Sequence, residues 1–259
     1  MAFSLGLTAD LMLALAARSI RTKQSYPPIL RLSPGIHFET GPAPRSIGGH
    51  PAGKGSWQSG ALVPRFRSPI IWIAGSEPLD SPEVARFANA LAASGRSVFL
   101  ETSGMSLKRR LHEFQPSSRF YFAVRFDGLE SREGRRNSRD GALRVGLEAI
   151  RMASLAGFFT CALLVFEPST AAGELQQLHA DISKLDVDGF LITCATPDPG
   201  MEKKVGQLRR RLLTRRWALL SSLLDASALS AASRTSQEIE RQPLSQSRPG
   251  DFEEGAEAG

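Results

Sequence analysis

Short apolar runs alternate with longer segments of helical periodicity along most of this chain. Residues 70–74 are five consecutive apolar residues that end at Gly75, a pattern typical of a strand buried on both faces. Residues 81–93 then place apolar side chains at helical spacing, and a second apolar run follows at residues 97–102. This order of segments predicts a right-handed βαβ unit.

The alternation continues to the carboxyl-terminal part of the chain. It predicts strands near residues 29, 70, 97, 119, 158 and 187. Helices are expected over residues 9–20 (with Thr8 as N-cap), 81–93, 107–114, 141–156, 171–185 and 202–225. Because strands and helices alternate, we expect an α/β fold with a parallel sheet. Ligands bind such sheets at the carboxyl ends of the strands, where the Gly75–Pro78 turn lies.

Composition divides the chain into three parts: an N-terminal helix over residues 1–27, an α/β domain over 28–225, and a tail over 226–259. The tail has six acidic residues, three arginines and few large apolar residues, so we expect it to be disordered. Within the domain, residues 35–69 contain seven glycines and five prolines and are expected to form an irregular loop. The Arg-rich residues 129–140 are expected to form a second loop.

The chain carries a formal net charge of +6, and residues 203–216 hold seven basic residues and no acid. We interpret these residues, like the basic run Lys108–Arg110, as the solvated outer face of a helix, and nucleic acid as an unlikely partner. The two cysteines, Cys161 and Cys194, lie in apolar runs and suggest a reducing compartment. No run approaches the ~20 apolar residues of a membrane span, so a cytoplasmic location is the expectation.

Three strand-end sequences resemble landmarks of one family. Ala74-Gly-Ser-Glu-Pro78, Leu100-Glu-Thr-Ser-Gly104 and Val124-Arg-Phe-Asp-Gly128 resemble, in order and spacing, motifs of the radical S-adenosylmethionine (SAM) family, and look most similar to proteins of the hopanoid-biosynthesis type. The resemblance implies an incomplete (β/α)6 TIM-like barrel. It also implies that the turn after the second strand contacts the methionine part of SAM, with Glu77 as its brace. The cofactor-binding residues implied in this way are Gly75, Ser76, Glu77, Pro78, Thr102, Arg125 and Asp127.

The chain departs from the family where the iron–sulfur cluster is held. In radical SAM proteins three cysteines after the first strand hold a [4Fe-4S] cluster, and its fourth iron chelates SAM. The corresponding positions here are Phe38, Pro42 and Arg45, which cannot ligate iron. His37, Glu39 and His50 match no metal-site spacing. We therefore expect no cluster and no metal site, while SAM remains a possible cofactor.

Four functions compete on this sequence. The first is a pseudoenzyme that keeps a SAM-like small-ligand site or acts on a protein partner in a regulatory role. The second is an unrelated (β/α) enzyme with a substrate at Glu101, Arg125 and Glu167. The third is a radical SAM enzyme with non-standard iron–sulfur ligation, and the fourth is a nucleic-acid binder that uses residues 203–216. Arg125 is open to two interpretations, since it either meets an anionic ligand or pairs with Glu101 or Asp127.

Overall fold

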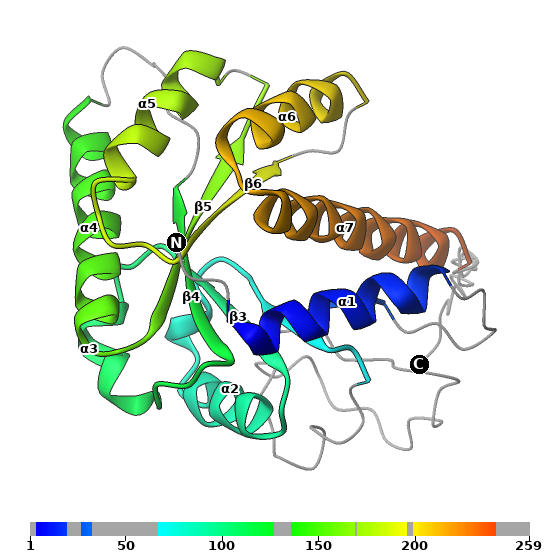
Figure 1. Cartoon of the computed structure of the whole chain (residues 1–259), viewed down its shortest axis with the longest axis horizontal. Helices are drawn as coiled ribbons and strands as arrows, with labels where there is room; N and C mark the ends of the chain where they lie inside the picture. Colours follow the sequence, from blue (N-terminus) through cyan, green and yellow to red (C-terminus); the bar gives the residue numbers. More distant parts are fainter. Residues whose placement is uncertain are drawn as a thin grey trace, which may run out of the picture.

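A single parallel sheet organises the structure, a computed structural model that describes residues 4–19, 27–32, 67–126, 136–168, 170–195 and 199–241. Its six strands lie in sequential order and all pair in parallel, as the sequence predicts. The strands are β1 (Ile29–Leu32), β2 (Ile70–Ile73), β3 (Ser97–Thr102), β4 (Phe120–Phe126), β5 (Phe159–Phe166) and β6 (Gly189–Cys194). Nearly every strand residue is buried, because helices cover both faces (Figure 1).

The outer face of the sheet carries the helices that connect the strands, together with α6, which follows the last strand. These are α2 (Val84–Ala93), α3 (Leu107–Arg110), α4 (Arg136–Leu155), α5 (Ala172–Ile182) and α6 (Pro199–Leu212), with short 3-10 turns η2 (Pro78–Asp80) and η3 (Leu111–Glu113). Their apolar faces join alternate strand residues such as Val98, Leu100 and Phe122 in one core cluster. The other strand residues form a second cluster with α1 (Leu5–Ser19) and α7 (Arg215–Arg241).

Helix α7 closes the open side of the sheet. It contacts both β1 and β6, the two edge strands, so the sheet is curled and α7 spans the gap between its edges. The fold is therefore a partial barrel of the predicted (β/α)6 type. The close approach of α7 to β6 depends on Gly189, because a Cβ there would lie 2.0 Å from Cζ2 of Trp217.

The barrel interior is filled over the first half of the strands. Trp72, Phe99, Tyr121 and Phe159 form a continuous layer across β2 to β5, with successive ring centroids 5.1, 4.6 and 5.2 Å apart. Leu7 and Leu11 of α1 pack into the same cluster. Polar interior positions remain at the carboxyl ends of the strands, which is where a ligand site is expected.

Several helix boundaries differ from the prediction. Helix α1 begins at Leu5, and its cap is Ser4, whose Oγ accepts the Leu7 N–H at 3.1 Å, so Thr8 is not the cap. Helix α4 begins at Arg136, inside the loop predicted over 129–140. The helix predicted over 202–225 is two helices, and the second continues to Arg241, into the predicted tail.

The basic run of α6 is not entirely on a solvated face. Arg209 is only 4 % exposed, and its Nε donates to the Ile192 carbonyl at 2.8 Å. Its guanidinium also bonds Asp225 of α7. This arginine was predicted to face solvent, and the structure corrects that prediction.

Within the described residues, no helix is both long and apolar enough to cross a membrane. Residues 33–66, which include most of the predicted 35–69 loop, lie outside the described residues, as do residues 127–135 and 242–259.

Candidate functional site at the strand ends

The turn after β2 is held by the side chain of Glu77. Glu77 is the N-cap of η2, and its Oε1 accepts the Leu79 N–H at 3.3 Å. Its Oε2 accepts both the N–H and the hydroxyl of Ser103, at 2.9 and 2.6 Å. One carboxylate thereby joins the turn after β2 to the end of β3. Its acceptor capacity is used within the protein, which makes Glu77 a brace for the turn.

The other residues predicted in this turn have different surroundings. Pro78 is buried and begins η2, whereas Gly75 is half-buried and Ser76 is exposed. Gly75 and Ser76 are therefore the members of this turn that a ligand at the strand ends can reach.

Thr102 does not line the mouth of the barrel. It is 1 % exposed, and its Oγ1 accepts the Gly104 N–H at 3.0 Å. Successive strand residues point to opposite faces, so Thr102 faces away from Glu101, its interior neighbour. Thr102, which the resemblance implies as a cofactor-binding residue, therefore does not share the interior position of Arg125. Asp127 lies outside the described residues.

A charged cluster occupies the interior at the strand ends. The described strands contain three charged residues, Arg31 in β1, Glu101 in β3 and Arg125 in β4, and all three meet. Arg125 Nη1 lies 3.1 Å from Glu101 Oε1, and Arg31 Nη2 lies 3.9 Å from Oε2. The Trp72 Nε1–H donates to Oε2 at 2.9 Å, and this bond fixes the orientation of the carboxylate.

Burial and charge distinguish the members of this Arg31–Glu101–Arg125 cluster. The Glu101 side chain is 8 % exposed, whereas Arg31 and Arg125 are 31 % and 26 % exposed. Arg125 Nη1 also approaches the Gly75 carbonyl at 3.4 Å, which connects the cluster to the turn after β2. Two guanidinium groups face one carboxylate within this cluster, and both guanidinium groups are partly open to solvent. An exposed guanidinium of this kind suits a carboxylate or phosphate group.

Sequence reasoning offered Arg125 either a ligand or a pairing with Glu101 or Asp127, and the structure contains the pairing with Glu101. A ligand at Arg125 stays a prediction. Sequence reasoning missed Arg31 and Trp72. A charge within an otherwise apolar strand was the available signal for Arg31, because a buried charge requires a partner. Glu167 follows β5 at the same end of the sheet, where its N–H donates to Thr170 Oγ1 at 3.2 Å.

The residues of the described chain do not fit an iron–sulfur cluster. Cys194 pairs in register with Phe166, five residues beyond Cys161 on β5, which separates the two cysteines by about 16 Å along the sheet. Burial raises the pKa of the Cys161 thiol well above its usual value and that of Cys194 to about 11. Cluster ligation requires thiolates. The described residues also contain no group of three or more His, Cys, Asp or Glu that could hold a metal ion.

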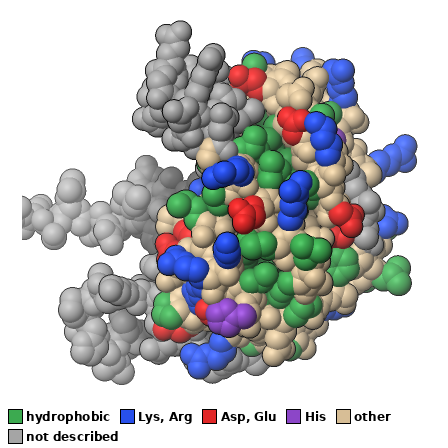
Figure 2. All heavy atoms as spheres, turned by 90° about the vertical axis from the view of Figure 1, so that its left-hand side faces the viewer, with side chains coloured by type: hydrophobic (Ala, Val, Ile, Leu, Met, Phe, Trp, Pro, Cys, Tyr) green, Lys and Arg blue, Asp and Glu red, His purple; other side chains and the backbone are tan. Residues whose placement is uncertain are grey.

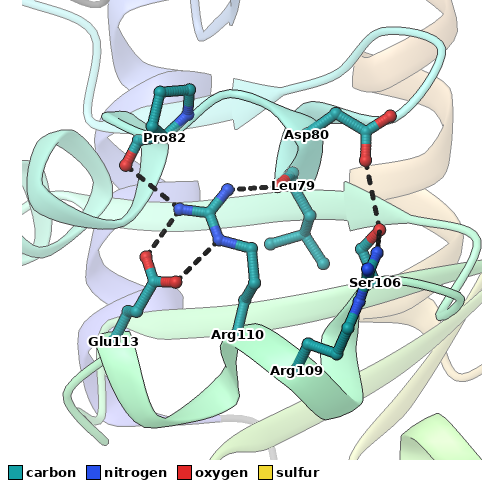
Figure 3. Close-up of a pocket in the computed structure, with 7 residues that line it drawn as sticks. All are labelled: Leu79, Asp80, Pro82, Ser106, Arg109, Arg110 and Glu113. Atoms are coloured by element: carbon teal, nitrogen blue, oxygen red, sulfur yellow. Dashed lines mark hydrogen bonds and ion pairs between the residues drawn. The ribbon is translucent and has the colours of Figure 1, made fainter.

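A hollow lies outside the barrel wall, between η2 and α3 (Figure 3). It has a volume of about 450 Å³ and is lined by Leu79, Asp80, Pro82, Ser106, Arg109, Arg110 and Glu113. Arg110 donates to the carbonyls of Leu79, Ser81 and Pro82 and pairs with Glu113. It was expected on an outer face, yet its side chain is only 15 % exposed. Arg110 thus anchors η2 from the side opposite Glu77.

Comparisons with known proteins give structural neighbours only. No family model matches the sequence, and no curated protein matches it. Among solved structures, the chain is similar to Streptococcus suis SuiB bound to S-adenosylmethionine, with 12 % identity and a TM-score of 0.47 over 82 % of this chain and 51 % of SuiB. For SuiB bound to precursor peptide SuiA, the identity is 11 % and the TM-score 0.48, over 80 % of this chain and 51 % of SuiB. For archaeal TYW1, the identity is 14 % and the TM-score 0.39, over 56 % of this chain and 50 % of TYW1.

These neighbours are radical SAM enzymes. The chain spans about half of their length. At this identity the likeness concerns the fold and assigns no activity.

Proposed function

We propose that this protein is a cluster-free relative of radical SAM proteins that binds a small carboxylate-bearing ligand at the carboxyl ends of its strands. The observation that carries the proposal is the Arg31–Glu101–Arg125 cluster, which presents two partly exposed guanidinium groups beside the braced turn after β2. Radical chemistry is not part of the proposal, because the chain has only two cysteines, Cys161 and Cys194. Their thiols lie far apart, and burial raises the pKa of each, which favours the neutral thiol. A pseudoenzyme with a ligand-dependent role fits these residues best.

Within this proposal, we expect the site to prefer one part of a SAM-like molecule. The carboxylate of the methionine moiety matches the guanidinium groups of Arg31 and Arg125. The sulfonium of SAM brings a positive charge next to two guanidinium groups, which opposes binding. S-adenosylhomocysteine has the same carboxylate and no sulfonium charge. We therefore expect it to bind at least as tightly as SAM.

Calorimetry with SAM, S-adenosylhomocysteine and methionine tests the proposal on the purified chain. Arg125→Ala and Arg31→Ala are each expected to weaken binding by about 10- to 100-fold, since a hydrogen bond to a charged group contributes about 1.5–3 kcal/mol. Arg109→Ala is the matched control, because it removes an exposed arginine at the hollow outside the barrel wall (Figure 3). It should leave the affinity unchanged.

The outcomes separate the competing functions. Equal loss in all three arginine variants would mean that net charge, not the cluster, attracts the ligand. Binding of inorganic phosphate without binding of any SAM-related compound would favour an unrelated (β/α) protein with its substrate at Glu101 and Arg125. Absence of binding by all of these ligands would refute the proposal.

A further inference from the structure

Helix α1 is attached to the barrel by one of its faces. Leu7 and Leu11 are 0 % and 4 % exposed and pack into the inner cluster. Asp10 is buried with them, and its Oδ2 accepts from Arg119 Nη1 at 2.8 Å and from the Ser97 hydroxyl at 2.6 Å. The ion pair between the buried Asp10 and the partly exposed Arg119, together with two buried leucines, fixes the rotation of α1 about its axis. The side chains on its other face are therefore held toward solvent.

The solvent-facing side of α1 is apolar. Leu5, Met12 and Leu13 are 90 %, 63 % and 60 % exposed, and Ala9 and Ala16 are exposed between and beyond them. Residues 5, 9, 12 and 16 recur at helical spacing and so form one stripe along the helix. In the described chain, the other large exposed hydrophobic residues, Met105 and Leu155, stand on different elements. The face that carries α4 mixes hydrophobic, basic and acidic side chains (Figure 2).

Arginines flank this apolar stripe. On one side, Arg216 at the start of α7 donates to Thr8 Oγ1 at 3.4 Å, where α7 and α1 run side by side (Figure 1). On the other side, the Arg119 guanidinium lies 3.3 Å from the position a Cβ on Gly6 would take. Three further exposed residues of the α6–α7 junction are Arg210, Arg211 and Arg215. A surface helix with an apolar stripe and basic borders has the pattern that lies in the headgroup region of anionic membranes.

We propose that α1 docks this protein onto an anionic lipid surface, with the apolar stripe in the headgroup region and the flanking arginines on the lipid phosphates. A second copy of the chain fits less well, because it brings the same excess of positive charge to the contact. Residues 33–66 fit less well for the same reason, since they contain three basic residues and one acid. An acidic protein partner would have to supply a hydrophobic groove for the helix, whereas a lipid surface accepts a convex apolar helix face without one.

Vesicle co-sedimentation of the full chain tests this proposal. We expect binding to vesicles of phosphatidylcholine and phosphatidylglycerol that is weakened by salt, and much weaker binding to phosphatidylcholine alone. Met12→Gln combined with Leu13→Gln should lower the partition coefficient about tenfold through lost apolar burial. Arg216→Gln should lower it about fivefold. Met105→Gln combined with Leu155→Gln is the matched control and should have no effect.

Because all of these side chains are exposed, the variants should keep the circular dichroism spectrum of the parent. Equal binding by the α1 double variant and the parent would overturn the proposal, as would equal binding to neutral and anionic vesicles. A dimer in sedimentation that the α1 variant abolishes, without vesicle binding, would instead assign the stripe to a second copy and overturn it as well.

Discussion

Arg209 supplies the sharpest test of how the barrel is closed, because three parts of the structure depend on its guanidinium. Its Nε donates to the Ile192 carbonyl on the free edge of β6 at 2.8 Å, and its Nη1 donates to Ser222 Oγ at 3.3 Å. Its Nη2 pairs with Asp225 of α7, whose Oδ1 accepts the Cys194 N–H. Side chains of α6 and α7 thus occupy the backbone groups that another strand would otherwise use.

Replacing Arg209 with methionine keeps most of the side-chain volume and removes the charge and the donors. The substitution leaves the Asp225 carboxylate buried without its partner. Breaking a buried ion pair in this way lowers the free energy of unfolding by about 3–5 kcal/mol. Replacing both charges, as Arg209→Met with Asp225→Leu, removes the unpaired carboxylate. The double variant should therefore recover at least half of the loss, since a buried pair exchanged for apolar groups is often close to neutral.

The loss should also depend on pH. Burial raises the pKa of Asp225, and Arg209 opposes that shift, so removing Arg209 raises the pKa of Asp225 in the folded state further. Below the pKa of the unfolded chain, ~3.9, the carboxyl is protonated in both states and carries no penalty. The penalty grows as pH rises through the folded-state pKa. The variant should therefore be less destabilised at pH 5 than at pH 7.

Urea unfolding followed by circular dichroism at both pH values measures these free energies. A loss below about 1 kcal/mol at pH 7 would refute the reasoning, because breaking a buried pair costs several times more. The same loss at both pH values would show that Asp225 does not titrate in response to its partner.

Three further predictions rest on single contacts. Gly189→Ala should destabilise the fold by about 2–3 kcal/mol and shift Trp217 fluorescence, because its Cβ would lie 2.0 Å from the indole; an unchanged urea midpoint and emission spectrum would contradict this. Glu77→Ala removes the acceptor of Ser103 and should cost about 2 kcal/mol in urea unfolding, with faster exchange of the Ser103 amide, and unchanged exchange would count against the brace. Cys194, with a pKa of about 11, should react with iodoacetamide at pH 8 about 100-fold more slowly than a free cysteine, and a normal rate would refute its neutral state.

The sheet could be predicted because its evidence is local. Each strand is a short apolar run ended by a turn residue, so the number and order of strands follow from the sequence alone. The break between α6 and α7 could not be predicted in the same way. The break falls at residues 212–214, which are Leu-Leu-Thr. None of these is a helix-breaking glycine or proline, and the apolar residues keep their helical spacing across the break. The burial of Arg209 also depends on a partner sixteen residues away, Asp225, which periodicity does not reveal.

The candidate site shows a different limit. In a strand buried on both faces, the alternation of apolar and polar residues disappears, so the sequence does not indicate which residues face the barrel interior. The resemblance implies Thr102 as a cofactor-binding residue, whereas its neighbour Glu101 occupies the interior position. Once one interior residue is known, the period of two in every strand assigns the rest.

Charge is the property that would have resolved that ambiguity. Arg31, Glu101 and Arg125 are the charged residues of the described strands, and a charge within a buried strand is stable only where it reaches a partner or solvent. All three lie near the carboxyl ends of their strands, where solvent access remains, so opposite charges on neighbouring strands predict one shared cluster. The Glu101 carboxylate orients both arginines at the cost of neutralising one of them. The proposed ligand site rests on these two guanidinium groups, and the calorimetry with the Arg31 and Arg125 variants tests it directly.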